Sequence, residues 1–140
     1  MKKDSRLSLL AAVDLFSGCS KKELQKIAPL TDMVEAEPGE VLTREGKPGG
    51  ELFVIAWGSA RVTLRGKEIA VLYPGDAFGE MALLARGPRS ATVTAQTPMT
   101  LYVLAPREFA TLLEEVPQVG RKMLKALATR LRRVRSSPIV

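Results

Sequence analysis

Histidine does not occur in the 140 residues, and its absence excludes much of enzyme chemistry. A Ser-His-Asp or Cys-His nucleophile and a His-ligated metal site all need an imidazole side chain. The single cysteine, Cys19, excludes an internal disulfide, which is typical of a reducing compartment. No apolar run reaches the roughly 18 residues that a membrane-spanning helix needs. We therefore expect a cytoplasmic chain with no histidine-dependent catalytic residues, no metal site and no membrane span.

Acidic residues are missing from residues 120–140, where seven lysines and arginines gather. This segment accounts for the net charge of +6, because residues 1–119 hold nearly equal numbers of acids and bases. Basic residues without aromatics or a reading motif are more typical of a solvated helix face than of a nucleic-acid interface. We expect no specific nucleic-acid binding, and non-specific binding of a polyanion is the alternative.

Two changes of hydrophobic period divide the chain. Residues 1–32 show helical spacing, and Ser20-Lys21-Lys22-Glu23 forms a capping box that predicts the start of a helix. Residues 33–105 show period two between turn signals, and residues 106–135 return to helical spacing as two helices. The clearest strands are expected at 52–55, 61–64, 69–72, 91–95 and 99–104.

This order predicts an α+β fold that is mainly β. An antiparallel β-roll or jelly roll is flanked by N-terminal helices and two C-terminal helices. The composition, 46% hydrophobic and 26% charged, is typical of one globular domain. We expect a single domain over residues 1–135 and a frayed tail at 136–140.

Residues 78–93 carry the strongest chemical signal. Gly79 has no Cβ, so its backbone can approach a ligand, and residues 80–84 can form a helical turn whose free N–H groups favour an anion. Arg89 stands nine residues after Glu80 and can return across the same pocket. An acid that accepts hydrogen bonds from sugar hydroxyls, free amides and an arginine suit a sugar-phosphate ligand.

The same segment resembles the phosphate-binding cassette of the cyclic-nucleotide-binding domain family, F-G-E-x-A-L, a short spacer, then P-R-(A/T/S)-A-(T/S)-V. The matching residues are Phe78, Gly79, Glu80, Ala82, Leu83, Pro88, Arg89, Ala91, Thr92 and Val93. Upstream turns and strands are similar too, so that the resemblance spans about residues 12–135. The family includes the ligand-binding domains of catabolite activator proteins and of protein kinase A regulatory subunits.

The resemblance implies a ligand, cAMP or cGMP, and no further cofactor. The residues implied to bind it are Gly79, Glu80, Met81, Ala82, Arg89, Ser90 and Ala91. The family pattern has Glu80 accept from the ribose 2′-hydroxyl and Arg89 pair with an exocyclic phosphate oxygen, while N–H groups near Ala82 and Ala91 complete the cradle. Ala at position 90 tends to accompany cAMP preference and Thr cGMP preference. Ser90 leaves base choice open, and we favour cAMP.

The apolar stripe of the last helix is compatible with three roles. Met123, Leu127 and Leu131 could close over the ligand as a lid, form the seam of a homodimer, or face the core, and the core is the default for any amphipathic helix. The family implies a regulatory module in signal transduction, in which the ligand shifts the C-terminal helices and an unidentified protein effector reads that shift.

Other interpretations remain open. The domain could have lost its ligand and serve as a protein- or polyanion-interaction module through the basic helix. It could also be a piece of a larger channel, kinase or transcription factor. Residues 1–19 faintly imitate a lipoprotein signal, but Asp4, Asp14 and Phe16 fit such a signal poorly, and we expect Cys19 to be a buried or half-buried thiol.

Overall fold

The computed structural model describes residues 3–134, so the expected tail at 136–140 lies outside the described residues. The chain begins with helices, as its spacing predicts. They are α1 (Lys3–Ala11), the 3-10 turn η1 (Asp14–Phe16), α2 (Lys21–Ile27) and the 3-10 turn η2 (Ala28–Leu30). The predicted capping box at the start of α2 is confirmed: the Glu23 N–H donates to the Ser20 hydroxyl, and the Ser20 N–H donates to the Glu23 carboxylate.

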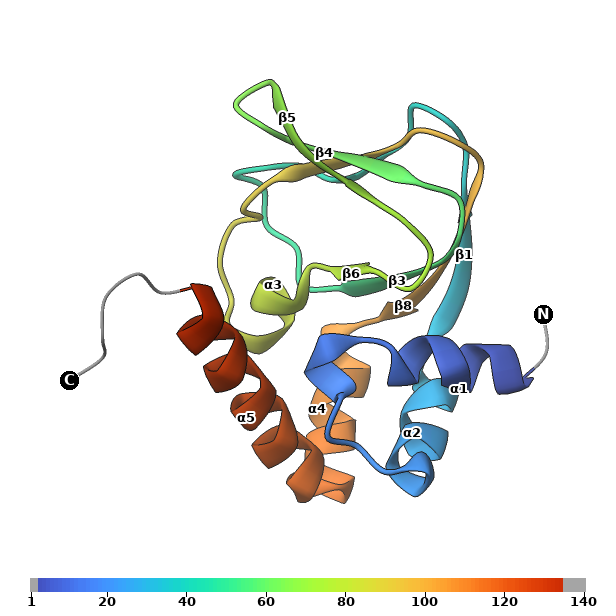
Figure 1. Cartoon of the computed structure of the whole chain (residues 1–140), viewed down its shortest axis with the longest axis vertical. Helices are drawn as coiled ribbons and strands as arrows, with labels where there is room; N and C mark the ends of the chain where they lie inside the picture. Colours follow the sequence, from blue (N-terminus) through green and yellow to red (C-terminus); the bar gives the residue numbers. More distant parts are fainter. Residues whose placement is uncertain (1–2, 135–140) are drawn as a thin grey trace.

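Eight strands form two antiparallel sheets of four strands each (Figure 1). The first sheet has the order β1-β8-β3-β6, and the second has the order β2-β7-β4-β5. The strands are β1 (Asp32–Ala36), β2 (Val41–Thr43), β3 (Leu52–Trp57), β4 (Ala60–Leu64), β5 (Lys67–Leu72), β6 (Ala77–Phe78), β7 (Thr92–Ala95) and β8 (Met99–Leu104).

Strand β3 joins the two halves of the core. Its first five residues are all buried, which is why the sequence there is continuously apolar instead of alternating. Leu52 and Val54 pack in one cluster with the helices, whereas Phe53 and Ile55 pack in a second cluster with residues of the other sheet. The first sheet therefore has helices on one face and the second sheet on the other.

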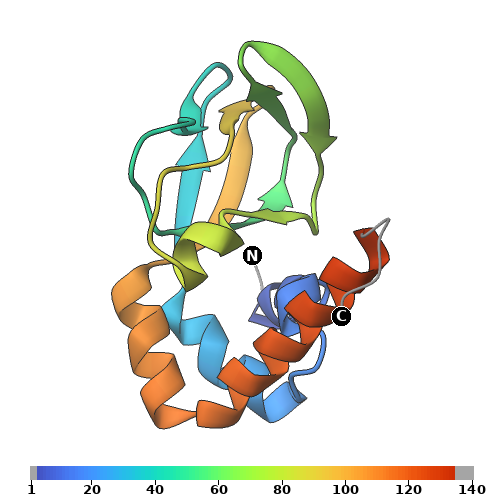
Figure 2. The same cartoon turned by 90° about the vertical axis from the view of Figure 1, so that its left-hand side faces the viewer.

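Two helices follow the strands, α4 (Pro106–Glu115) and α5 (Pro117–Val134), and both begin with a proline, a residue that suits the first helical turn. Buried side chains of α4 and α5 join the helix-side cluster. The two views of the chain place strands in one half and helices in the other, with the short helix α3 (Glu80–Leu84) at their junction (Figures 1 and 2). The predicted fold class is confirmed.

Candidate ligand-binding site

Gly79 allows the turn between β6 and α3. Its φ of 89° lies in the left-handed region, which residues with a Cβ rarely adopt. A Cβ at this position would also collide with the Glu51 carbonyl oxygen and with the Arg89 guanidinium. The close approach that the sequence suggests at Gly79 is therefore made to the chain itself, and it brings the start of α3 against the loop before β3.

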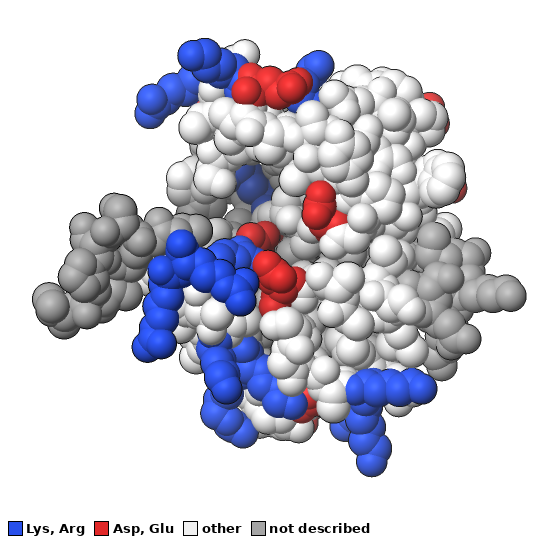
Figure 3. Space-filling view, in the orientation of Figure 1, with Lys and Arg blue, Asp and Glu red and all other residues white. Residues whose placement is uncertain are grey.

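A cavity of about 320 Å³ lies between α3 and the second sheet. All seven residues that the sequence suggests for ligand binding line it: Gly79, Glu80, Met81, Ala82, Arg89, Ser90 and Ala91. Apolar side chains of β4, β5 and β7 complete its wall, among them Val62, Leu72 and Val93. Figure 3 shows the hollow between the strands and the helices, with a basic side chain inside it. The cavity is the size of a small-ligand site and holds a cation, a carboxylate and apolar surface.

Arg89 is the cation of this cavity, and it is 8% exposed. Its Nη1 donates to the Glu51 carbonyl oxygen, and its Nη2 donates to the Glu51 carboxylate, each over 3.0 Å. The guanidinium carbon lies 5.8 Å from the centroid of the Phe53 ring, which stacks on Phe78. A buried charge needs such partners, because removing it from water is costly. These contacts fix Arg89 in one orientation before any ligand arrives.

Glu51 is a site residue that sequence reasoning missed. It follows Gly49-Gly50 at the entrance to β3, and a Cβ at Gly49 would collide with the Arg89 side chain. Paired glycines before a strand indicate a close approach of backbone to another group. That signal was available in the sequence, but it does not identify Arg89 as the group that approaches.

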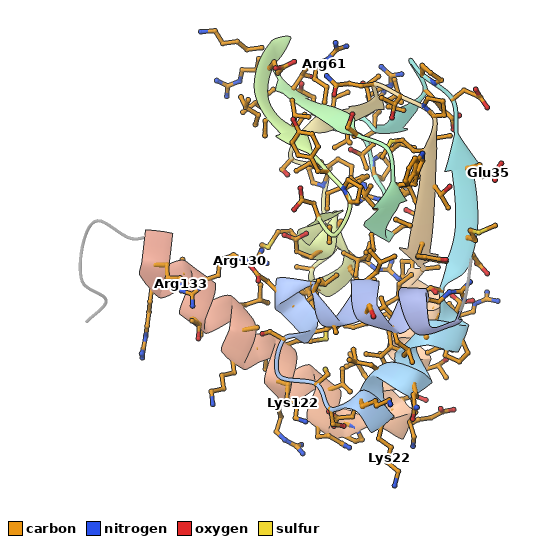
Figure 4. The ribbon with its side chains drawn as sticks, turned by 45° about the vertical axis from the view of Figure 1, so that its right-hand side comes forward. Lys22, Glu35, Arg61, Lys122, Arg130 and Arg133 are labelled. Atoms are coloured by element: carbon orange, nitrogen blue, oxygen red, sulfur yellow. The ribbon has the colours of Figure 1, made fainter. Side chains whose placement is uncertain are left out.

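Glu80 is held by the last helix. Arg130 of α5 donates from Nη1 to Glu80 Oε1 over 2.8 Å, and the two side chains are 39% and 19% exposed. Figure 4 shows Arg130 reaching from α5 toward the junction of strands and helices. The sequence gives no sign of this pair, because 50 residues separate the partners and Arg130 is one of seven basic residues in its segment.

The three residues suggested as a lid occupy different environments. Met123 is 1% exposed in the helix-side core, Leu127 packs partly buried against that core, and Leu131 is 51% exposed. Within the described part of the chain, none of the three lines the cavity beside α3. Met123 thus has the default role of an amphipathic helix, and the lid stays a prediction for the ligand-bound state.

Two titratable groups with shifted pKa values lie away from the cavity. A hydrogen bond from Lys122 of α5 lowers the pKa of Glu23, and the Ser20 N–H adds to this effect. Burial raises the pKa of the Cys19 thiol, with Glu23 adding to the rise. Cys19 is half-buried, as the sequence predicts. The raised pKa makes Cys19 a poor nucleophile.

The described residues 3–134 contain neither a cluster of metal ligands nor a membrane-spanning helix. In that range no group of three or more cysteine, aspartate or glutamate side chains is arranged to hold a metal ion. None of the helices in that range is long and apolar enough to cross a membrane.

The geometry defines a class, a small β-roll domain with an arginine-bearing cavity beside a short helix. The family model "Cyclic nucleotide-binding domain" matches residues 33–116. The chain therefore belongs to the cyclic nucleotide-binding domain family, as the cassette resemblance predicts.

Similar proteins are known from sequence and from structure. A potassium/sodium hyperpolarization-activated cyclic nucleotide-gated channel 3 of Mus musculus is 33% identical over 90% of this chain, which spans only 16% of the channel. The N-terminal domain of a transcriptional regulator from Streptomyces coelicolor superimposes with a TM-score of 0.82 at 29% identity, over 94% of this chain and 98% of that one. The regulatory domain of Toxoplasma gondii PKA, solved with cAMP, has a TM-score of 0.72 at 32% identity, and the match covers 79% of this chain and 44% of that one.

Proposed function

We propose that the chain binds cAMP in the cavity beside α3 and acts as a regulatory module rather than as an enzyme. The observation that carries the proposal is the buried Arg89, a fixed cation in a small-ligand cavity that all seven suggested binding residues line. The likeness to a PKA regulatory domain solved with cAMP supports the choice of a cyclic nucleotide. The assignment of cAMP over cGMP is the finer part of the proposal and depends on Ser90.

Arg89 can bind a phosphate without leaving its present partners. A guanidinium carries five N–H donors, and the two hydrogen bonds to Glu51 use two of them. The remaining donors are available to an exocyclic phosphate oxygen, together with N–H groups in the first turn of α3, which have no partner within that helix. The phosphate would then be a second anion beside Arg89, and the positive charge of Arg89 would be shared between the phosphate and the Glu51 carboxylate.

Glu80 links the nucleotide to α5. If Glu80 accepts a hydrogen bond from the ribose 2′-hydroxyl, Arg130 has to release or share the carboxylate that it holds over 2.8 Å. A ligand shifts a conformational equilibrium only when it binds the two conformations with unequal affinity. Here the two conformations are those with the Arg130–Glu80 pair formed and broken, and the nucleotide binds more tightly when the pair is broken. We propose that the bound nucleotide thereby shifts α5, and that a protein effector or a second copy of the chain in the cytoplasm reads this shift.

The test is isothermal titration of the chain with cAMP and with cGMP, for the wild type, Arg89→Ala and Arg86→Ala. Arg86 is an exposed arginine of the same segment that does not line the cavity, so its variant is the matched control. Losing a charge-assisted hydrogen bond of about 1.5–3 kcal/mol weakens binding roughly ten- to a hundred-fold. We expect this loss in Arg89→Ala and none in Arg86→Ala.

Because Arg89 also supports the fold, circular dichroism must show that Arg89→Ala is folded, and Arg89→Lys serves as a second variant. Lysine keeps the charge but loses the planar fork that a phosphate recognises. A folded wild type that gives no heat and no thermal shift with either nucleotide would contradict the proposal. The chain would then be a ligand-free interaction module.

A further inference from the structure

A second cavity, of about 420 Å³, lies between η1 and α5 and shares no lining residue with the cavity of the cassette. Asp14, Ser17 and Gly18 form one wall, and a Cβ added at Gly18 would be in van der Waals contact with the Lys122 side chain. The other wall is one face of α5, whose polar members are Lys122, Lys125, Thr129, Arg130 and Arg133. The volume is within the range of small-ligand sites.

The charge of this cavity is strongly unbalanced. Four cations line it against a single carboxylate, that of Asp14. They recur at intervals of three to five residues, which brings them to one side of the helix. Figure 4 labels three of them, Lys122, Arg130 and Arg133, along α5. Figure 3 shows lysine and arginine side chains gathered over α5. Like charges crowded on a helix repel one another, and an anion among them removes that cost.

Two of these cations are already engaged and two are available. Lys122 pairs with Glu23, and Arg130 pairs with Glu80. Among the described residues, the side-chain ammonium of Lys125 and the guanidinium of Arg133 have no hydrogen-bond or ion-pair partner. They lie eight residues apart, about 12 Å along the helix, a distance that two long side chains can bridge onto one ligand.

We propose that this cavity binds a compact anion with two or more phosphate groups. Arginine forms paired hydrogen bonds with phosphate oxygens, and lysine supplies a point charge beside them. Lys125 and Arg133 are the main ligands, and the Ser17 hydroxyl lines the opposite wall. The concave shape and the small volume favour a diphosphate group over an extended polyanion.

Arg130 couples this cavity to the cassette, a step that rests on the proposed function. The same guanidinium lines the basic cavity and pairs with Glu80. An anion that attracts Arg130 frees Glu80 for the ribose, and a nucleotide that displaces Arg130 adds positive charge to the basic cavity. Both directions give positive coupling of equal size, as linkage requires.

The first experiment titrates the intact chain with pyrophosphate at constant ionic strength. The variants are the pair Lys125→Gln with Arg133→Gln and the control pair Arg121→Gln with Arg132→Gln. The control residues are exposed, lie on the same helix and do not line the cavity, so both pairs change the net charge equally. We expect the first pair to bind roughly ten-fold more weakly than the control pair. Equal affinities in the two pairs, or no binding to the wild type, would overturn the site.

Two further arms identify the source and the coupling. Vesicles that contain a phosphoinositide bisphosphate present the same phosphate groups on a lipid. If the chain binds these vesicles, and if the Lys125→Gln and Arg133→Gln pair weakens this binding while the control pair does not, the ligand is assigned to a lipid instead of a soluble anion. Saturating pyrophosphate should strengthen cAMP binding up to about five-fold. Unchanged cAMP affinity overturns the coupling. A chain that binds pyrophosphate but no cyclic nucleotide rejects the proposed function and keeps the site.

Discussion

At the residue scale, the cassette depends on contacts that precede any ligand. Arg89 and Gly79 both contact Glu51: the arginine donates to its backbone and side chain, and the glycine lies against its carbonyl oxygen. The loop before β3 therefore sets the position of the cation and of the first turn of α3 together. Because both contacts converge on Glu51, a small displacement there should change the geometry of the whole proposed phosphate site.

Gly79 and Gly39 provide a matched pair for measuring this constraint, because both have a φ of 89°. An added Cβ meets no atom within 4 Å at Gly39, whereas at Gly79 it collides with Glu51 and Arg89. We expect Gly39→Ala to lower the free energy of unfolding by about 1–2 kcal/mol, the cost of a left-handed residue with a Cβ. Gly79→Ala should lower the free energy of unfolding clearly more than Gly39→Ala does, as measured by urea denaturation. Equal costs would show that the contact with Glu51 adds no constraint.

Ser90 gives the residue-scale prediction for base choice. Its side chain is exposed at the cavity, so substitutions there leave the fold intact. If the hydroxyl contacts the guanine amino group, Ser90→Thr should shift the ratio of cGMP to cAMP affinity toward cGMP, and Ser90→Ala toward cAMP. One neutral hydrogen bond corresponds to about three- to ten-fold in that ratio. Titration with both nucleotides measures it, and identical ratios in the three proteins would exclude a role in base choice.

At the element scale, local sequence patterns predicted the helices and strands but missed the side-chain bonds that join one element to another. The capping box of α2, the apolar run of β3 and the fixed spacing of the cassette are all legible because each depends on neighbours in the chain. The bonds of Arg89 to Glu51 and of Arg130 to Glu80 join residues 38 and 50 positions apart. Only the packing of the elements decides which of several charged residues meet, so these partners could not be found from spacing.

If the nucleotide binds Glu80 as proposed, the Arg130–Glu80 pair makes α5 its competitor for that carboxylate. We expect Arg130→Ala to bind cAMP up to about five-fold more tightly, since a partly exposed ion pair is worth at most about 1 kcal/mol. Arg121→Ala, on the same helix and away from both cavities, should leave the affinity unchanged. Isothermal titration compares the three proteins. Weaker cAMP binding by Arg130→Ala would show instead that Arg130 assists the bound nucleotide.

At the scale of the whole molecule, the N-terminal helices are joined to α5 behind the cavity of the cassette. Lys122 of α5 donates to Glu23 of α2 across 99 residues, and Met123 beside it is buried with Phe16 and Ile27. The N-terminal helices therefore hold one end of α5, while the other end carries Arg130 and Arg133 near the two cavities. A helix fixed at one end can respond to a ligand by movement at the other.

This tie predicts how stability depends on pH. Because the Lys122 hydrogen bond lowers the pKa of Glu23 below its ordinary value of 4.5, the unfolded chain takes up this proton at a higher pH than the folded chain. The contribution of the pair is therefore complete above the ordinary pKa and is lost as the pH falls through the folded pKa. We expect Glu23→Gln, which retains an N3 residue suited to the capping box, to lower the free energy of unfolding by about 1 kcal/mol at pH 7.

The difference between the wild type and Glu23→Gln should begin to shrink as the pH falls below the ordinary pKa of 4.5, because the unfolded chain then takes up the Glu23 proton before the folded chain does. Urea denaturation at several pH values measures this difference, with Glu114→Gln, an exposed carboxylate of α4, as the control. A difference that stays constant across this range would mean that the amide disturbs packing at α2 and that the charge of Glu23 does not hold α5. In that case the buried apolar side chains of α5, Val119 and Met123, would be its anchor, and acid would leave the proposed response of the helix to nucleotide unchanged.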